Sequence, residues 1–227
     1  MEPRPPFTRR QSRLLIIGGV LAVALLAALG LILASHLGGK TSNKITLAAN
    51  PATNLPTSGK VLGNPQSAVK VVEWGNYLCP HCADFSRNSE PQLITDYVAD
   101  GRASLEFRVV AVGGKEAEDA ARASYCAQDQ GAFWVYHDTL FANQTGKAGQ
   151  FSAARLKTIA ADLGLDTAGF DSCFDGGAHA TDVSQLLDAS KQSGINELPT
   201  FFVNGQKVTY TGYASVKAAI DAALAQH

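Results

Sequence analysis

The hydrophobic pattern of this 227-residue chain changes sharply along its length. Twenty apolar residues without a charge run from Leu14 to Leu33, and a stretch rich in Gly, Ser, Thr, Asn and Pro follows over 35–62. Beyond that stretch, short β-branched runs alternate with helical periodicity. The pattern therefore predicts an N-terminal segment (1–13), a membrane-spanning helix (14–34), a linker (35–62) and one folded domain (63–227).

The apolar segment is long enough to cross a membrane, because a helix of twenty residues spans about 30 Å. Four arginines precede it, and only Lys40 and Lys44 follow it closely. The positive-inside rule then places residues 1–13 in the cytoplasm and the domain outside it. The alternative is a cleaved signal peptide with a site near Ala28-Leu29-Gly30, although the apolar part of such peptides is usually shorter. Both interpretations put the folded domain outside the cytoplasm.

Within the domain, the pattern predicts the order β-α-β, a run of helices, and then a β-hairpin followed by a helix. The strands are predicted at 68–74, 105–112, 200–203 and 207–211, the last pair being joined by Asn204-Gly205. The helices are predicted at 79–99 with a break near Pro91, throughout 115–193, and at 215–225. This order gives an α/β fold with a mixed sheet, and the helices over about 115–193 form an inserted subdomain.

The formal net charge of −1 is the sum of two unlike parts. Residues 1–59 contain six Lys and Arg against one Glu, whereas residues 60–227 contain thirteen against nineteen Asp and Glu. Because nucleic-acid binding needs a basic face, the acidic domain excludes a general nucleic-acid binder. Apolar residues make up 46% of the chain, so its core does not depend on a disulfide scaffold.

Two of the four cysteines form the motif Cys79-Pro80-His81-Cys82, which follows a predicted strand and begins a predicted helix. The free N–H groups and the dipole of a helix N-terminus stabilise the thiolate of the first cysteine, and a protonated His81 adds positive charge. A stabilised thiolate favours the reduced form, so the disulfide is an oxidant. A zinc half-site is the alternative, but the other two cysteines lack the short spacing of zinc ligands.

Three segments together resemble the DsbA family of thioredoxin-fold thiol-disulfide oxidoreductases, in its membrane-anchored type: VVEWGNYLCPHC, YCAQDQGAFWVYHDTLFANQ and GINELPTFFVNG. The resemblance covers about residues 60–227 and implies a thioredoxin-like fold with an inserted α-helical subdomain. It implies that Cys79 is the exposed nucleophile and Cys82 the buried resolving cysteine, with Pro80 and His81 tuning the pair. It also implies a cis-proline and a substrate-binding segment, formed by Leu198, Pro199 and Thr200. Leu198 departs from the Val or Thr that family members often have there.

Glu73 lies six residues before Cys79 on the predicted strand. A carboxyl group among apolar residues is unusual, because its burial costs free energy. Its position matches the buried acid of similar proteins, which could exchange a proton with Cys82. The alternative is a side chain that faces solvent on the alternating strand.

Cys126 and Cys173 lie in two predicted helices of the insert. A structural disulfide is the hypothesis for a domain outside the cytoplasm, and some members of the family have such a second bridge. Closing this loop would stabilise the fold by about 4 kcal/mol at most. Two buried, unpaired thiols are the alternative.

An aromatic run in the insert is predicted to belong to the core rather than to a ligand pocket, because aromatic side chains at helical spacing usually pack in the interior. Its members are Phe133, Trp134, Tyr136 and His137.

The features together predict a single-pass protein of the cell membrane that acts as a dithiol oxidase. It is expected to form disulfide bonds in unfolded, cysteine-containing secreted or surface proteins by exchange at Cys79 and Cys82. A membrane oxidase of the DsbB or VKOR type is the expected reoxidant, and we expect a monomer that needs no metal or organic cofactor. The alternatives are a disulfide reductase or isomerase on the same fold, and a non-catalytic peptide-binding chaperone that uses the groove at Pro199.

Overall fold

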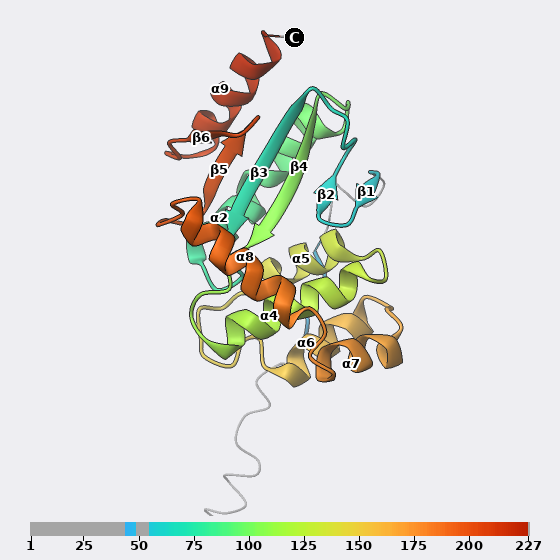
Figure 1. Ribbon diagram of the computed structural model, residues 1–227. Helices are drawn as coiled ribbons and strands as arrows, with labels where there is room; N and C mark the ends of the chain where they lie inside the picture. The colour runs from blue at the N-terminus through green and yellow to red at the C-terminus, as the bar shows by residue number, and fades with distance from the viewer. Residues whose placement is uncertain (1–43, 49–54, 227) are drawn as a thin grey trace, which may run out of the picture. The chain divides into compact units, whose positions relative to one another are not determined.

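The computed structural model describes residues 44–48 and 55–226, and their fold is built on a six-stranded mixed sheet (Figure 1). The strand order is β1-β2-β4-β3-β5-β6. β3 and β4 are parallel, and the other neighbouring pairs are antiparallel. The strands are β1 (Thr57–Ser58), β2 (Val61–Leu62), β3 (Val69–Gly75), β4 (Ala103–Val109), β5 (Thr200–Val203) and β6 (Gln206–Val208).

The parallel pair β3 and β4 lies at the centre of the sheet. Val69 and Val71 of β3 are buried while Lys70 between them is exposed, as expected for side chains that alternate between two faces. A parallel pair requires a crossover, which α2 (Pro80–Asn88), α3 (Glu90–Leu93) and the π-helical turn η1 (Ile94–Val98) provide. α9 (Tyr213–Leu224) packs beside η1, where Tyr97 Oη donates to Asp221 Oδ1 at 2.5 Å.

Five helices between β4 and β5 form the inserted subdomain, at the end of the sheet toward which β3 and β4 point (Figure 1). They are α4 (Lys115–Gln128), α5 (Phe133–Ala142), α6 (Ala153–Asp162), α7 (Thr167–Asp175) and α8 (Ala180–Gln192). The aromatic side chains of α5 are at most 4% exposed, so the prediction that they belong to the core is confirmed. The subdomain therefore shares a continuous hydrophobic interior with the sheet.

A disulfide joins α4 to α7 inside this subdomain. The sulfur atoms of Cys126 and Cys173 are bonded at 1.97 Å, and their Cα atoms are 5.8 Å apart. Cys126 is buried and Cys173 is partly exposed. The sequence left a disulfide and two unpaired thiols as alternatives, and the structure contains the disulfide.

The stretch expected to be a linker is partly structured. β1 and β2 form a hairpin in which Val61 and Leu62 pair with the outer edge of β4, and Leu62 is fully buried. Ile45 is also buried, and Thr46 exchanges backbone hydrogen bonds with the Asn143 side chain. The hairpin forms because it satisfies the open edge of β4 and removes apolar surface from water.

The predicted N-terminal segment (1–13) and membrane helix (14–34) lie outside the described residues. Within residues 44–48 and 55–226, no helix combines the length and apolar character needed to cross a membrane.

Replacing both bridged cysteines, as Cys126→Ala with Cys173→Ala, is expected to lower the free energy of unfolding by about 2–4 kcal/mol, because the cross-link restricts the unfolded chain. Urea unfolding of both proteins measures the difference. Alkylation of the native wild-type chain without reductant supplies the control. Labelled thiols at positions 126 and 173 would contradict the bridge.

Candidate active site

The motif Cys79-Pro80-His81-Cys82 lies where β3 ends and α2 begins. Cys79 is the N-cap residue of α2, and its sulfur accepts a hydrogen bond from the backbone N–H of Cys82 at 3.3 Å. Pro80 occupies the first helical position, where its missing N–H costs no hydrogen bond. The local sequence therefore places the Cys79 sulfur at the positive end of the helix.

The two sulfur atoms have opposite environments. Cys79 is half-buried, and its pKa is lowered to about 6 by the hydrogen bond from the Cys82 side chain, by the N–H groups of Cys82 and His81, and by the His81 charge. Cys82 is fully buried, and burial raises its pKa strongly, with the neighbouring Cys79 and Glu73 adding to the effect. At neutral pH the reduced site thus holds one reactive thiolate and one protonated thiol.

A cis peptide bond joins Leu198 to Pro199 and faces the dithiol. The carbonyl oxygen of Leu198 is 3.6 Å from the Cys79 sulfur, which identifies this backbone as the neighbour of the reactive atom. Thr200 is buried, begins β5 and donates its hydroxyl to the Glu197 carbonyl at 2.6 Å. A cavity of about 220 Å³ adjoins the segment, lined by His81, Asp84, Glu197, Leu198, Pro199 and Tyr210.

Glu73 points into the core, so the solvent-facing alternative is wrong. Glu73 lies on the same face of β3 as the buried Val69 and Val71, opposite the face that carries the exposed Lys70. The residue is 1% exposed. Glu73 Oε1 has no hydrogen-bond partner among the described residues. Burial raises its pKa well above the ordinary value, and the charges of Glu90 and Cys79 raise it further. A protonated carboxyl group therefore lies near the Cys82 thiol.

Two polar side chains, Gln144 and Asn76, hold the loop before Cys79, and no sequence pattern predicts their contacts. Gln144 Nε2, just after α5, donates to the carbonyl oxygens of Tyr77 at 2.7 Å and of Cys79 at 3.0 Å. The buried Asn76 accepts from the Leu78 N–H and donates to Val112. A single Gln in a helical insert is common, so only the fold reveals this contact.

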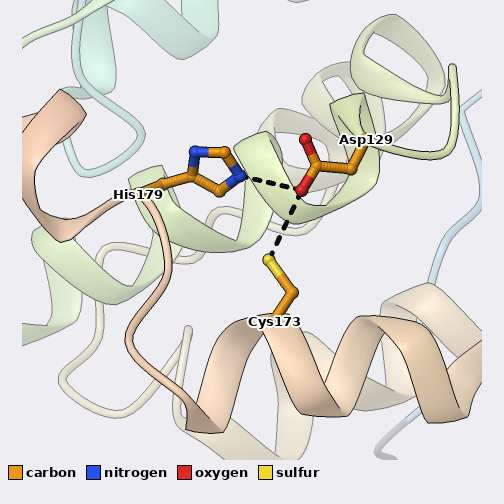
Figure 2. Close-up of side chains that lie close together, drawn as sticks. All are labelled: Asp129, Cys173 and His179. Carbon is orange, nitrogen blue, oxygen red and sulfur yellow. Dashed lines mark hydrogen bonds and ion pairs between the residues drawn. The ribbon is translucent and has the colours of Figure 1, made fainter.

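The side chains of metal-ligating types that cluster in the described part of the chain lie away from the dithiol. The Cys79 and Cys82 sulfurs gather no third His, Asp, Glu or Cys ligand in the described part of the chain. Elsewhere, Asp129, Cys173 and His179 lie close together (Figure 2). The sulfur there belongs to a disulfide, so its 3.7 Å contact with Asp129 involves no thiolate. His179 instead bridges two carboxylates, with Nε2 2.8 Å from Asp129 and Nδ1 2.6 Å from Asp182.

Comparison with known proteins finds a matching family model and relatives of this chain. A family model described as thioredoxin matches residues 56–222. The Na(+)/H(+) antiporter NhaA 1 of Salinispora arenicola is 33% identical over 155 residues, which make up 67% of this chain and 22% of the antiporter. The match therefore spans only a fraction of that relative's length.

Two further relatives match over more of their length. The probable disulfide bond formation protein D of Bacillus cereus is 24% identical over 221 residues, which make up 95% of this chain and 99% of that protein. The crystal structure of oxidised BdbD from Bacillus subtilis has a TM-score of 0.69 at 26% identity, over 74% of this chain and 93% of that chain.

Alkylation of the reduced protein by iodoacetamide between pH 4 and 9 is expected to follow one titration at Cys79 with a midpoint near pH 6. In Cys82→Ala the midpoint should rise and the rate at pH 6 should fall severalfold, because the sulfur loses a hydrogen-bond donor. Peptide mapping identifies the labelled cysteine. A wild-type midpoint at the ordinary thiol pKa of about 8.5 would contradict the assigned environment.

Proposed function

The chain belongs to the DsbA-like thioredoxin family and is a thiol-disulfide oxidoreductase. From this premise we propose that it is a dithiol oxidase that forms disulfide bonds in proteins outside the cytoplasm. The observation that carries the proposal is the contrast between its two sulfurs. Stabilisation of the Cys79 thiolate favours the reduced site, and a site that favours its reduced form takes electrons from substrate thiols.

The exchange begins when a substrate thiolate attacks the Cys79 sulfur of the oxidised site. A bond forms between the substrate sulfur and Cys79, and the bond to Cys82 breaks, so that Cys82 leaves as a thiolate. Because a buried thiolate is costly, the nearby Glu73 carboxyl gives it a proton. Glu73 is then left ionised until it regains a proton from solvent.

A second substrate thiolate then attacks the substrate sulfur of the mixed disulfide. Cys79 leaves as a thiolate, for which its low pKa makes it a good leaving group. The substrate has lost two electrons and has gained a disulfide, and the enzyme dithiol has taken up those two electrons. The 3.6 Å distance between the Leu198 carbonyl and the Cys79 sulfur supports a role for Leu198, Pro199 and Thr200 in aligning the substrate peptide at this sulfur.

The proposal includes an arrangement at the cell membrane. Residues 14–34 anchor the chain, residues 1–13 stay in the cytoplasm, and a membrane oxidase of the DsbB or VKOR type reoxidises the dithiol. The supporting features are the twenty apolar residues from Leu14 to Leu33 and the arginines before them. The protein acts as a monomer, and the redox-active pair Cys79 and Cys82 serves without metal or organic cofactor.

Two other functions remain distinct from this proposal. A reductase or isomerase on the same fold would have a more reducing dithiol, since thioredoxin lies at about −270 mV. A peptide-binding chaperone would use the cavity at Pro199 without redox chemistry, so Cys79→Ser would leave the folding yield of a reduced substrate unchanged.

The equilibrium of the dithiol with glutathione is expected to give a reduction potential closer to DsbA, at about −120 mV, than to thioredoxin. Cys82→Ala should accumulate mixed disulfides with substrate proteins, because no resolving thiol remains, whereas the matched Cys79→Ser variant should capture none. Non-reducing gels followed by mass spectrometry identify the captured proteins. A potential near that of thioredoxin would overturn the oxidase assignment.

The membrane arrangement has its own test. The cells are first stripped of the layers outside the cell membrane, and the membrane itself is kept unbroken. Protease added to these cells should cleave the domain and leave the anchor in the membrane fraction. Deletion of residues 1–34 should leave the protein in the soluble fraction. A domain that stays protected from protease in cells stripped of their outer layers, but with the cell membrane intact, would contradict the proposed orientation.

A further inference from the structure

Two buried ionisable side chains, Glu90 and His137, and the partly buried Asp138 take no part in the exchange steps. Glu90 lies at the start of α3 and is 2% exposed, and His137 on α5 is completely buried. His137 Nε2 is 3.4 Å from Glu90 Oε2 and 3.9 Å from Oδ1 of the adjacent Asp138. Within the described part of the chain, neither carboxyl group forms an ion pair with Lys or Arg.

The surroundings of this cluster do not stabilise two negative charges. The ring of His137 packs against Phe107 with a centroid distance of 4.4 Å and against Phe141 at 4.9 Å. Burial lowers the pKa of His137 to about 4, raises that of Glu90 to about 8 and raises that of Asp138 well above its ordinary range. At neutral pH the imidazole is therefore uncharged, and the two carboxyl groups hold at least one proton between them.

Hydrogen bonding gives that proton a position. Asp138 Oδ1 is buried without a partner. The hydrogen bond between the two carboxyl groups raises the pKa of Asp138 and lowers that of Glu90, so Asp138 holds the shared proton and donates it to Glu90. The interacting atoms of Glu90, His137 and Asp138 all lie within 4.8 Å of one another. Tyr77 Oη lies 3.3 Å from Nδ1 of the imidazole, and if it donates there, Nε2 carries the ring proton and faces Glu90.

Three features connect the cluster to the active site. Tyr77 belongs to the loop that leads into α2. In the sheet, Glu73 pairs with Phe107, whose ring packs against His137. The charge of Glu90 also adds to burial in raising the pKa of Glu73. A negative charge at Glu90 therefore raises the pKa of Glu73, the carboxyl group that gives its proton to Cys82.

We propose that Glu90 is a positioning residue whose charge state, set by His137 and Asp138, decides whether Glu73 gives its proton to Cys82. The inference rests on the proposed role of Glu73 in the exchange. While Glu90 is neutral, Glu73 can give its proton to the Cys82 thiolate, because the transfer moves one negative charge from the sulfur to a carboxyl group whose neighbour Glu90 is uncharged. When Glu90 has lost its proton to solvent, a second charge opposes that release. Cys82 then stays ionised and attacks the Cys79 sulfur, so the Cys79–Cys82 disulfide forms again, the bond between Cys79 and the substrate breaks, and the substrate leaves as an unoxidised thiolate.

Ionisable groups face Glu90 from several elements. They are Glu73 from β3, Tyr77 from the loop before α2, and His137 and Asp138 from α5. On α2, the exposed Arg87 donates to the Phe141 carbonyl at the end of α5, with Nε at 3.0 Å, so it does not neutralise the carboxyl pair.

Glu90→Gln is expected to remove this control. The equilibrium constant of the dithiol with glutathione, measured from pH 5 to 10, should show an inflection near pH 8 in the wild type, where Glu90 titrates, and the variant should lack it. The carbon-13 shift of the Glu73 carboxyl group should titrate at lower pH in the reduced variant. Glu118→Gln, at an exposed carboxylate on α4, is the matched control and should behave as wild type.

A Glu90→Gln profile identical to that of Glu118→Gln overturns the inference and leaves the oxidase proposal intact. If Glu90→Gln does not fold by circular dichroism, Asp138→Asn replaces it, since the variant removes the ionisable carboxyl group that shares a proton with Glu90 and must move the inflection. An inflection unmoved in Asp138→Asn overturns the inference as well. Glu73→Gln distinguishes a failure of the Glu73 role from a failure of the proposed function. A wild-type pH profile in this variant refutes the proton transfer from Glu73. Mixed-disulfide trapping tests the exchange at Cys79 independently.

Discussion

The unequal solvation of two sulfur atoms three residues apart is the constraint on which the site depends. A helix N-terminus can stabilise only the sulfur that reaches its free N–H groups, and here that is the N-cap residue Cys79. Cys82, one turn later, is directed into the core and fully buried. The same helix therefore makes one sulfur easy to ionise and the other difficult, and the electron flow that we propose, from substrate thiols to the dithiol, rests on this difference.

The chain contains a second cysteine pair whose surroundings give it the opposite behaviour. Cys126 is buried among the helices of the insert, and the partly exposed Cys173 has the Asp129 carboxylate 3.7 Å from its sulfur. A thiolate that approaches this bridge meets a negative charge instead of a helix N-terminus, which disfavours attack. Local electrostatics thus separate a bridge that exchanges from a bridge that holds the fold together.

The sequence predicted those parts of the molecule that depend on contiguous residues. The run before Cys79 has β-branched composition, Pro80 marks the first helical turn, and Asn204-Gly205 marks the hairpin, so strands, helices and the dithiol were found within a few residues of their ends. The pairing of Glu90 with His137 could not be found, because it joins residues 47 positions apart through packing alone. The hairpin at Val61 was missed because two residues carry too little periodicity to predict a strand.

The contact of Gln144 with the loop carbonyls has a consequence for how such proteins can be rebuilt. The reactive tetrapeptide is held by a side chain that lies 65 residues later in the chain, at the end of a helix in the insert. Grafting the four residues onto another scaffold would therefore transfer their sequence without the Gln144 hydrogen bonds that hold the backbone around the Cys79 sulfur. The inserted helices and the redox loop form one structural unit, so a change in one constrains which changes the other can accept.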